Sequence, residues 1–204
     1  IYNDVLYFHS NGVIYRYPLK NQTSLTPLPS APTAYVFRCL TIDSHGNVYL
    51  TEGGHGTNVY VYIADQSEWS TLTDKLYYGR ELPSCNVFNG KLYIIGTTLG
   101  SARAPFSIEI MDISDLSKAT RIVNPSLWYF ANNELYPGVY SHRSVNIGEQ
   151  IYIIGGFTQT AYIDNNGNTY AAGPTNAVQI LDTITETVYT ILDGVKQFPA
   201  TITD

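Results

Sequence analysis

Short apolar runs separated by turn residues recur along the chain in the same order. The clearest run lies in 89–96, where an Asn-Gly pair precedes Lys-Leu-Tyr-Ile-Ile and a glycine follows. An Asn-Gly pair between apolar runs predicts a tight turn that leads into a β-strand. Equivalent runs place four tyrosines in register, at spacings of 42, 44 and 59 residues: Tyr7, Tyr49, Tyr93 and Tyr152. The recurrence predicts a repeat protein built from small antiparallel sheets, with insertions in the last unit.

Each unit is predicted to contain four short strands. The fourth unit has them at 144–147, 151–154, 178–182 and 187–191, and the third at 85–88, 92–95, 108–112 and 120–123. The second has them at 40–42, 48–51, 59–62 and 69–72. The first has only 5–8, 13–17 and 24–28, while 198–204 has the pattern of the strand it lacks. A C-terminal strand added there would close a ring and remove open sheet edges.

The sequence therefore predicts an all-β fold, a small β-propeller of four four-stranded blades whose first blade is closed by the C-terminal strand. We expect a single domain over 1–204, with units at about 1–30 plus 198–204, 35–75, 80–123 and 137–192. No shift in composition marks a boundary between two domains. Two alternatives stay open: two chains that combine their units, and a chain that is part of a longer one.

Three further features are shared with a known family: glycine pairs after second strands, a later aromatic pair, and arginines where units begin. The residues concerned are Gly53-Gly54, Gly155-Gly156, Tyr62, Trp69, Arg38, Arg80 and Arg143. In these features, over nearly its whole length, the chain resembles kelch-type β-propellers, which usually have more units. It departs from them at Gly96-Thr97, which replaces a glycine pair, and in the first unit, which has neither that pair nor the Trp. The stretch 43–50 resembles the hairpin of NHL-type propellers instead.

Composition and charge narrow the range of partners. Charged residues make up only 14% of the chain, the net charge is -6, and the 11 Lys and Arg are scattered singly. No basic stripe is present to neutralise phosphates, so we expect no nucleic-acid partner. No apolar run approaches the roughly 18 to 20 residues that a membrane-spanning helix needs, so we expect no membrane insertion. Few lysines and many Tyr, Thr, Asn and Gly residues favour an extracellular or particle-surface location.

Two cysteines, Cys39 and Cys85, occupy the same strand position in adjacent units. Two are too few for a disulfide framework, so we expect two buried thiols that act as small apolar side chains.

The predicted strand order also sorts the connections onto two faces. Almost all the excess length, 97–106, 124–142 and 158–176, falls on one of them, and long loops on a rigid scaffold commonly bind ligands. Aromatic side chains there suit protein partners or sugar rings. The predicted ligand-binding residues are Arg103, Trp128, Tyr129, Phe130, Tyr136, Tyr140, His142, Tyr162 and Tyr170. For Trp128, Tyr129 and Phe130, packing onto the core between the last two blades is the alternative.

Evidence for catalysis is sparse in the sequence. The four histidines are dispersed, and no His-x-x-x-His, Cys-x-x-Cys or Gly-x-Ser-x-Gly pattern occurs. Some kelch-like propellers are copper oxidases that use Tyr, Cys and His, but we find no matching motif around His55, His142 or Cys85, and we interpret the histidines as surface residues. The stretch 164–168 begins like a calcium loop, yet the turn glycine and the bidentate Glu are missing, which favours an Asx-rich turn. We expect no catalytic residue, metal or cofactor.

Together these patterns predict a non-enzymatic binding module that uses its long-loop face to bind a protein or carbohydrate, as a surface or appendage component. The alternatives are a structural subunit of a fibre or assembly, an intracellular adaptor, and a metal-dependent lectin or propeller enzyme. Self-association is left open by the sequence.

Overall fold

The protein is all β wherever the computed structural model describes it, apart from one 3-10 turn at Leu116–Lys118. The described residues are 4–10, 13–20, 24–32, 39–53, 56–97, 107–122, 139–158, 162–163 and 169–191. Their strands pair antiparallel in every sheet. No helix in these ranges has the length and apolar character needed to cross a membrane.

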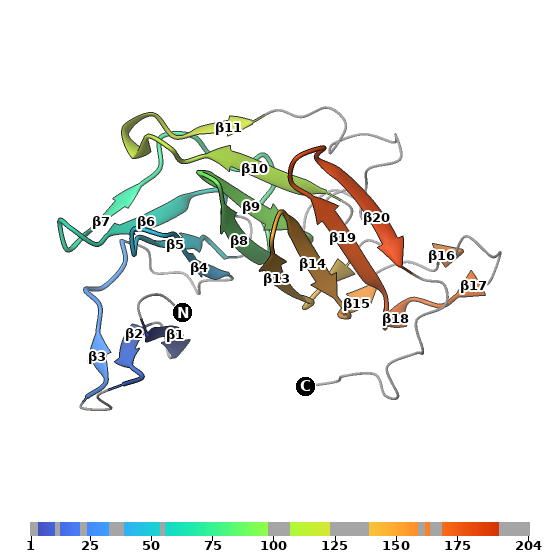
Figure 1. The fold of residues 1–204 in the computed structure, drawn as a ribbon, viewed down its shortest axis with the longest axis horizontal. Coiled ribbons are helices and arrows are strands. Elements are labelled where there is room, and N and C mark those ends of the chain that lie inside the picture. The colour runs from blue at the N-terminus through green and yellow to red at the C-terminus, as the bar shows by residue number, and fades with distance from the viewer. Residues whose placement is uncertain are drawn as a thin grey trace.

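Four larger sheets follow one another in chain order and lie along an arc (Figure 1). Sheet 1 contains β1 (Val5–Ser10), β2 (Val13–Pro18) and β3 (Thr26–Pro27). Sheet 2 contains β4 (Leu40–Ile42), β5 (Val48–Thr51), β6 (Val59–Ile63) and β7 (Glu68–Thr71). Sheet 3 contains β8 (Ser84–Phe88), β9 (Lys91–Ile95), β10 (Ile108–Asp112) and β11 (Thr120–Ile122). Sheet 4 contains β13 (Arg143–Ile147), β14 (Gln150–Ile154), β19 (Val178–Asp182) and β20 (Thr187–Ile191).

Two smaller sheets accompany sheet 4. One has the strand order β12 (Val139–Tyr140), β15 (Phe157–Thr158) and β18 (Gly173–Pro174), and the other pairs β16 (Tyr162–Ile163) with β17 (Thr169–Tyr170). The sequence placed these segments in long connections without strands. Strands of two residues are too short to show a period of two, so the pattern could not reveal them.

The strands predicted in all four units are confirmed, with ends that differ by at most two residues. The turn at Asn89-Gly90 is confirmed as well, because φ is positive at both residues, +48° and +69°. Sheet 1 has three described strands, and residues 198–204 lie outside the described ranges. Closure of the first blade by the C-terminal strand therefore stays a prediction.

The sheets pack face to face, and the two middle strands of sheets 2 and 3 (β5, β6, β9 and β10) are largely apolar on both sides. In β9, Leu92 and Ile94 pack toward sheet 2, whereas Tyr93 and Ile95 pack toward sheet 4. Successive strand residues point to opposite faces, so a sheet between two neighbours needs apolar residues at nearly every position. This packing explains why the central strands appear in the sequence as continuous apolar runs.

Candidate functional site

The small sheet β12–β15–β18 extends sheet 4 on the side of the molecule where the long connections were predicted. After β14, Gly155 and Gly156 adopt φ of +64° and +94° before β15 begins. Backbone bonds continue across this bend, since Gly155 N–H donates to the Ala177 carbonyl at 3.0 Å and Thr175 N–H donates to the Gly156 carbonyl at 2.9 Å. The extension is therefore a continuous part of the sheet 4 scaffold.

An aromatic pair lies on this extension. Tyr140 of β12 stacks on Phe157 of β15, with ring centroids 5.8 Å apart and planes inclined by 24°. Both residues are half-buried. Tyr162 and Tyr170 are opposite one another in the β16–β17 pair. Tyr140 is thus the predicted binding residue for which the structure describes an aromatic neighbour.

The remaining predicted binding residues, apart from His142, fall outside the described ranges: Arg103, Trp128, Tyr129, Phe130 and Tyr136. Residues 164–168 fall outside as well. Their assignments stay predictions. In the part of the chain that is described, no group of three or more His, Cys, Asp or Glu side chains could hold a metal ion.

His142 is buried, with 2% of its surface exposed, so interpreting it as a surface histidine was wrong. Its segment passes between sheets 3 and 4, held there by a glycine from each. A Cβ on Gly96 would overlap the Val139 carbonyl oxygen and lie 2.9 Å from His142 Cε1. A Cβ on Gly156 would lie 2.5 Å from the Tyr140 carbonyl oxygen. Only glycine permits this approach. A role for His142 in ligand binding stays a prediction.

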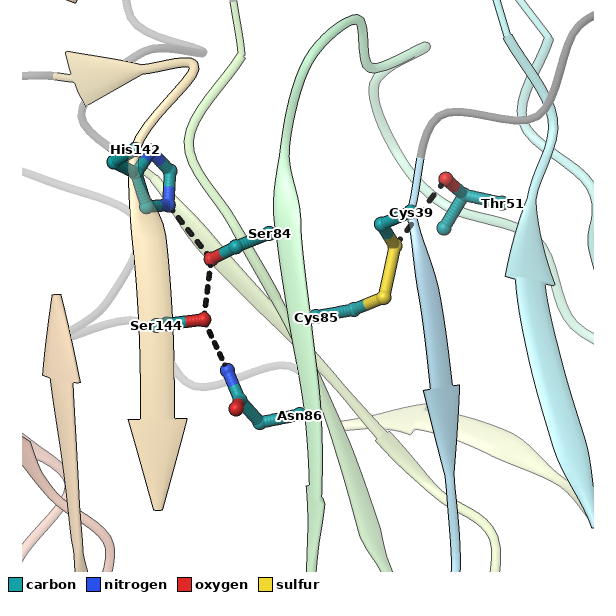
Figure 2. Close-up of a disulfide and its surroundings, with 7 residues drawn as sticks. All are labelled: Cys39, Thr51, Ser84, Cys85, Asn86, His142 and Ser144. Carbon is teal, nitrogen blue, oxygen red and sulfur yellow. Dashed lines mark hydrogen bonds between the residues drawn. A yellow bond between two sulfur atoms is a disulfide. The ribbon is translucent and has the colours of Figure 1, made fainter. Parts of the chain in front are cut away.

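A chain of hydrogen bonds joins His142 to β8 and β13, the first strands of sheets 3 and 4 (Figure 2). Asn86 Nδ2 donates to Ser144 Oγ at 2.5 Å, and Ser144 Oγ donates to Ser84 Oγ at 2.7 Å. Each hydroxyl has one hydrogen, so Ser84 is left to donate to His142 Nε2, 2.7 Å away. This order assigns the ring hydrogen to Nδ1, which is buried and has no hydrogen-bond partner among the described residues.

The Ser84–His142 contact has the separation of a nucleophile and a general base. Burial and, to a smaller extent, the positive charges of Arg143 and Arg80 together lower the pKa of His142 to about 3. The ring is therefore neutral at neutral pH and is a weak proton acceptor. This chemistry suits a link between two sheets better than activation of a serine.

A disulfide joins Cys39, which directly precedes β4, to Cys85 of β8, with Cα atoms 5.8 Å apart. The expectation of two buried thiols was wrong. The cysteines are 46 residues apart in sequence, and packing of β4 against β8 brings them together. The first strands of sheets 2, 3 and 4 are thus linked one to the next. The disulfide joins β4 to β8, and the hydrogen bonds of His142 and Ser144 join β8 to β13 (Figure 2).

A fully buried ion pair fixes the entry into sheet 3. Arg80 Nε donates to Glu109 Oε1 at 3.0 Å, and Arg80 Nη1 donates to the carbonyl oxygens of Gly96 and Ser107 at 3.0 and 3.1 Å. Both side chains are 0% exposed. The Glu109 carboxylate also accepts the backbone N–H of Tyr77 at 2.6 Å. The hydrogen-bond partners of this pair include the backbone of Tyr77, Gly96 and Ser107, so the pair holds these three segments together.

A groove of about 370 Å³ opens on the opposite face, where the short turns lie. The β4–β5 turn forms one wall and the turns of sheet 3 form the other, through Asp43, Ser44, His45, Val87, Phe88, Asn89, Gly90, Ile113 and Ser114. Asp43 stabilises its own turn. Its carboxylate accepts hydrogen bonds from the backbone N–H of Asn47 and from the hydroxyl of Tyr49, both at 2.9 Å. The groove was not among the predicted binding surfaces.

The polar residues of β8 and β13 were not predicted as a site, although the sequence contains a signal for them. Ser84 and Asn86 alternate in β8, and Ser144 and Asn146 alternate in β13. Matching polar positions on two otherwise apolar strands would have indicated a polar contact between the units.

No protein-family model and no curated protein matches the chain. Among solved structures, one described as "Structure of YjhT" matches with a TM-score of 0.62 at 18% sequence identity. The match covers 94% of this chain and 62% of that one. This chain is therefore similar in fold to that protein over nearly its whole length, and spans less than two thirds of it.

Proposed function

We propose that the protein is a non-enzymatic binding module of the kelch-like propeller type, whose long-loop face binds a protein or a carbohydrate. In this proposal sheets 1 to 4 are the blades, and residues 198–204 supply the missing strand of the first blade. The observation that best supports the binding role is the stacked Tyr140–Phe157 pair on the small sheet that extends sheet 4.

Rings held in this way suit recognition. Both partners are on strands, so ordering them costs little conformational entropy when a ligand binds. A half-buried aromatic ring provides a flat apolar surface for a sugar ring or for an apolar side chain, and the Tyr140 hydroxyl adds a polar group. Tyr162 and Tyr170 on the β16–β17 pair, together with the predicted residues outside the described ranges, would widen this surface.

The disulfide supports a location for this module. Structural disulfides persist in oxidising environments and are rare in the cytosol. The Cys39–Cys85 bond therefore favours the extracellular or particle-surface location over an intracellular adaptor.

The experiment compares Tyr140→Ala and Tyr162→Ala with Tyr189→Ala, an exposed tyrosine on β20, using a printed glycan array and peptides selected by display on the wild type. We expect the first two variants to bind at least about tenfold more weakly with little change in stability, because truncating an aromatic hot-spot residue costs about 2 kcal/mol or more of binding free energy. The core variant Ile153→Ala should instead lose about 2 to 5 kcal/mol of stability. Equal binding by all three tyrosine variants would refute the proposal.

The metal-dependent lectin or propeller enzyme is the alternative. Only a serine-enzyme form has a contact in its favour, the 2.7 Å separation of Ser84 Oγ and His142 Nε2, and the lowered pKa of His142 counts against that form. Metal analysis of the purified protein and a chelator titration test the metal-dependent form. An absence of stoichiometric metal and an unchanged unfolding curve with chelator would remove the metal-dependent form. Unchanged ligand turnover in Ser84→Ala would remove the serine form.

A further inference from the structure

The groove between the β4–β5 turn and the turns of sheet 3 combines an apolar lining with a carboxylate on each side. Asp43 belongs to one wall. On the other wall, the backbone N–H and the hydroxyl of Ser114 donate to the Asp112 carboxylate at 3.0 and 2.6 Å. Apolar side chains of sheet 3 and its turns line the groove: Val87, Phe88 and Ile113. A lysine or arginine side chain matches this arrangement, because it has an apolar stem and a cationic head.

The groove opens on a face where the excess negative charge of the described residues is concentrated. This short-turn face consists of the turns between first and second strands and between third and fourth strands of sheets 2, 3 and 4, with the strand residues next to them. Its two lysines are paired within the face, Lys91 with Glu186 at 2.7 Å and Lys118 with Asp115 at 3.4 Å. Six more carboxylates of the face form no ion pair with a described residue: Asp43, Asp65, Glu68, Asp112, Glu149 and Asp182. Elsewhere among the described residues, five acidic side chains are balanced by six basic ones.

Exposed apolar side chains extend this surface beyond the groove. Gly90 lines the groove, and the next residue, Lys91, reaches sheet 4 through its ion pair with Glu186. Ile184, in the same β19–β20 turn as Glu186, is 63% exposed, and Ile147 at the end of β13 is 58% exposed. Among the large apolar side chains that the structure describes, these two are the most exposed. A surface with both carboxylates and exposed apolar side chains suits a protein segment better than a small cation.

Neither this chain nor a second copy of it supplies the complementary charge. The residues outside the described ranges contain three basic and four acidic side chains, and a second copy has the same net charge of -6. We propose that the groove binds a lysine- or arginine-containing segment of a different protein, with cationic heads near Asp43 and Asp112 and apolar side chains over the groove lining. This site lies on the face opposite the long loops, so the inference is independent of the ligand-binding role proposed for them.

Fluorescence anisotropy tests the proposal with a labelled peptide of lysine, leucine and glycine, and with a control peptide in which glutamate replaces lysine. The variants are Ser44→Lys, in the groove, and Ser70→Lys, on β7 and outside the groove lining. Both serines are exposed and both changes add one positive charge, so the variants differ in position. We expect Ser44→Lys to bind the lysine peptide at least about tenfold more weakly than the wild type, because like charges would meet in the groove. Ser70→Lys should bind within about twofold of the wild type, and added salt should weaken binding.

A second pair of variants removes one charge without adding bulk. Asp112→Asn and Asp182→Asn are matched, because each aspartate ends the third strand of its sheet and accepts the backbone N–H of the residue two positions later. We expect about two- to fivefold weaker binding for Asp112→Asn and a smaller change for Asp182→Asn. Equal affinity of Ser44→Lys and Ser70→Lys for the lysine peptide would overturn the proposal, because attraction to the whole acidic face would then account for binding. Equal signals from the lysine and glutamate peptides with the wild type would overturn it as well.

Discussion

Substitution of Gly96 by alanine tests whether the segment that contains His142 is held by close approach of the backbone. Gly96 has a φ of +64°, and Gly148, in the β13–β14 turn, has a φ of +59°. An added methyl group at Gly148 would meet nothing within 4 Å, whereas at Gly96 it would meet Val139 and His142. The two glycines therefore have nearly the same backbone conformation, and they differ in whether neighbouring atoms crowd an added methyl group.

The expected magnitudes follow from this difference. A left-handed conformation costs an alanine about 1 to 2 kcal/mol, and this cost applies at both positions. Forcing a methyl group into packed atoms costs about 1 to 3 kcal/mol more, and this cost applies only at Gly96. We therefore expect Gly148→Ala to lose about 1 to 2 kcal/mol of unfolding free energy and Gly96→Ala about 2 to 5 kcal/mol.

Urea unfolding followed by circular dichroism measures both values, and equal denaturant slopes would show that the unfolding transition is comparable in the two variants. A second comparison adds Ser84→Ala to each glycine variant. Displacement of His142 by the Gly96 substitution would already weaken its hydrogen bond to Ser84. The double variant Gly96→Ala, Ser84→Ala should therefore lose less stability than the sum of its two single variants. For Gly148→Ala combined with Ser84→Ala, the two single losses should simply add. Equal losses for the two single variants would refute the close-approach argument.

Three further predictions concern the disulfide, the buried histidine and the buried ion pair. Reduction of the Cys39–Cys85 bond, or replacement of both cysteines by serine, should lower the unfolding free energy by about 4 kcal/mol for the 46-residue separation, measured by urea unfolding with and without reductant. Because folding lowers the pKa of His142 from 6.5 to about 3, the folded state binds fewer protons between these values, and stability should fall as pH drops below 6.5. By pH 5 this loss should reach about 2 kcal/mol, and His142→Gln should remove that part of the pH dependence in unfolding curves. Glu109→Gln should cost about 3 to 5 kcal/mol because it leaves the buried Arg80 charge uncompensated, and Arg80→Met combined with Glu109→Met should cost less than the sum of the single changes in a double-mutant cycle.

Local pattern was sufficient for the strands. The segments 108–112, 178–182 and 187–191 were predicted with the ends that the structure has, because apolar runs and turn residues mark both limits of each strand. The Asn89-Gly90 turn was predictable for the same reason, since these residues adopt positive φ at low cost.

The candidate site was predictable only in part. Tyr140 was predicted as a binding residue because it lies on the long-loop face. Its stacking on Phe157 was not predictable, because it depends on the pairing of β12 with β15. The length of the loops and their aromatic content are visible in the sequence, whereas the pairing of two-residue strands across those loops is not.

By itself, the sequence determined the strands, their order and their two-sided apolar character, because strand alternation and turn conformation depend on neighbouring residues. Tertiary structure decided the contacts between sheets. Cys39 and Cys85 are 46 residues apart and Ser84 and His142 are 58 apart, and each pair meets because adjacent sheets pack at a particular distance and rotation. Side-chain volumes throughout the shared cores set that distance, so no local pattern contains it.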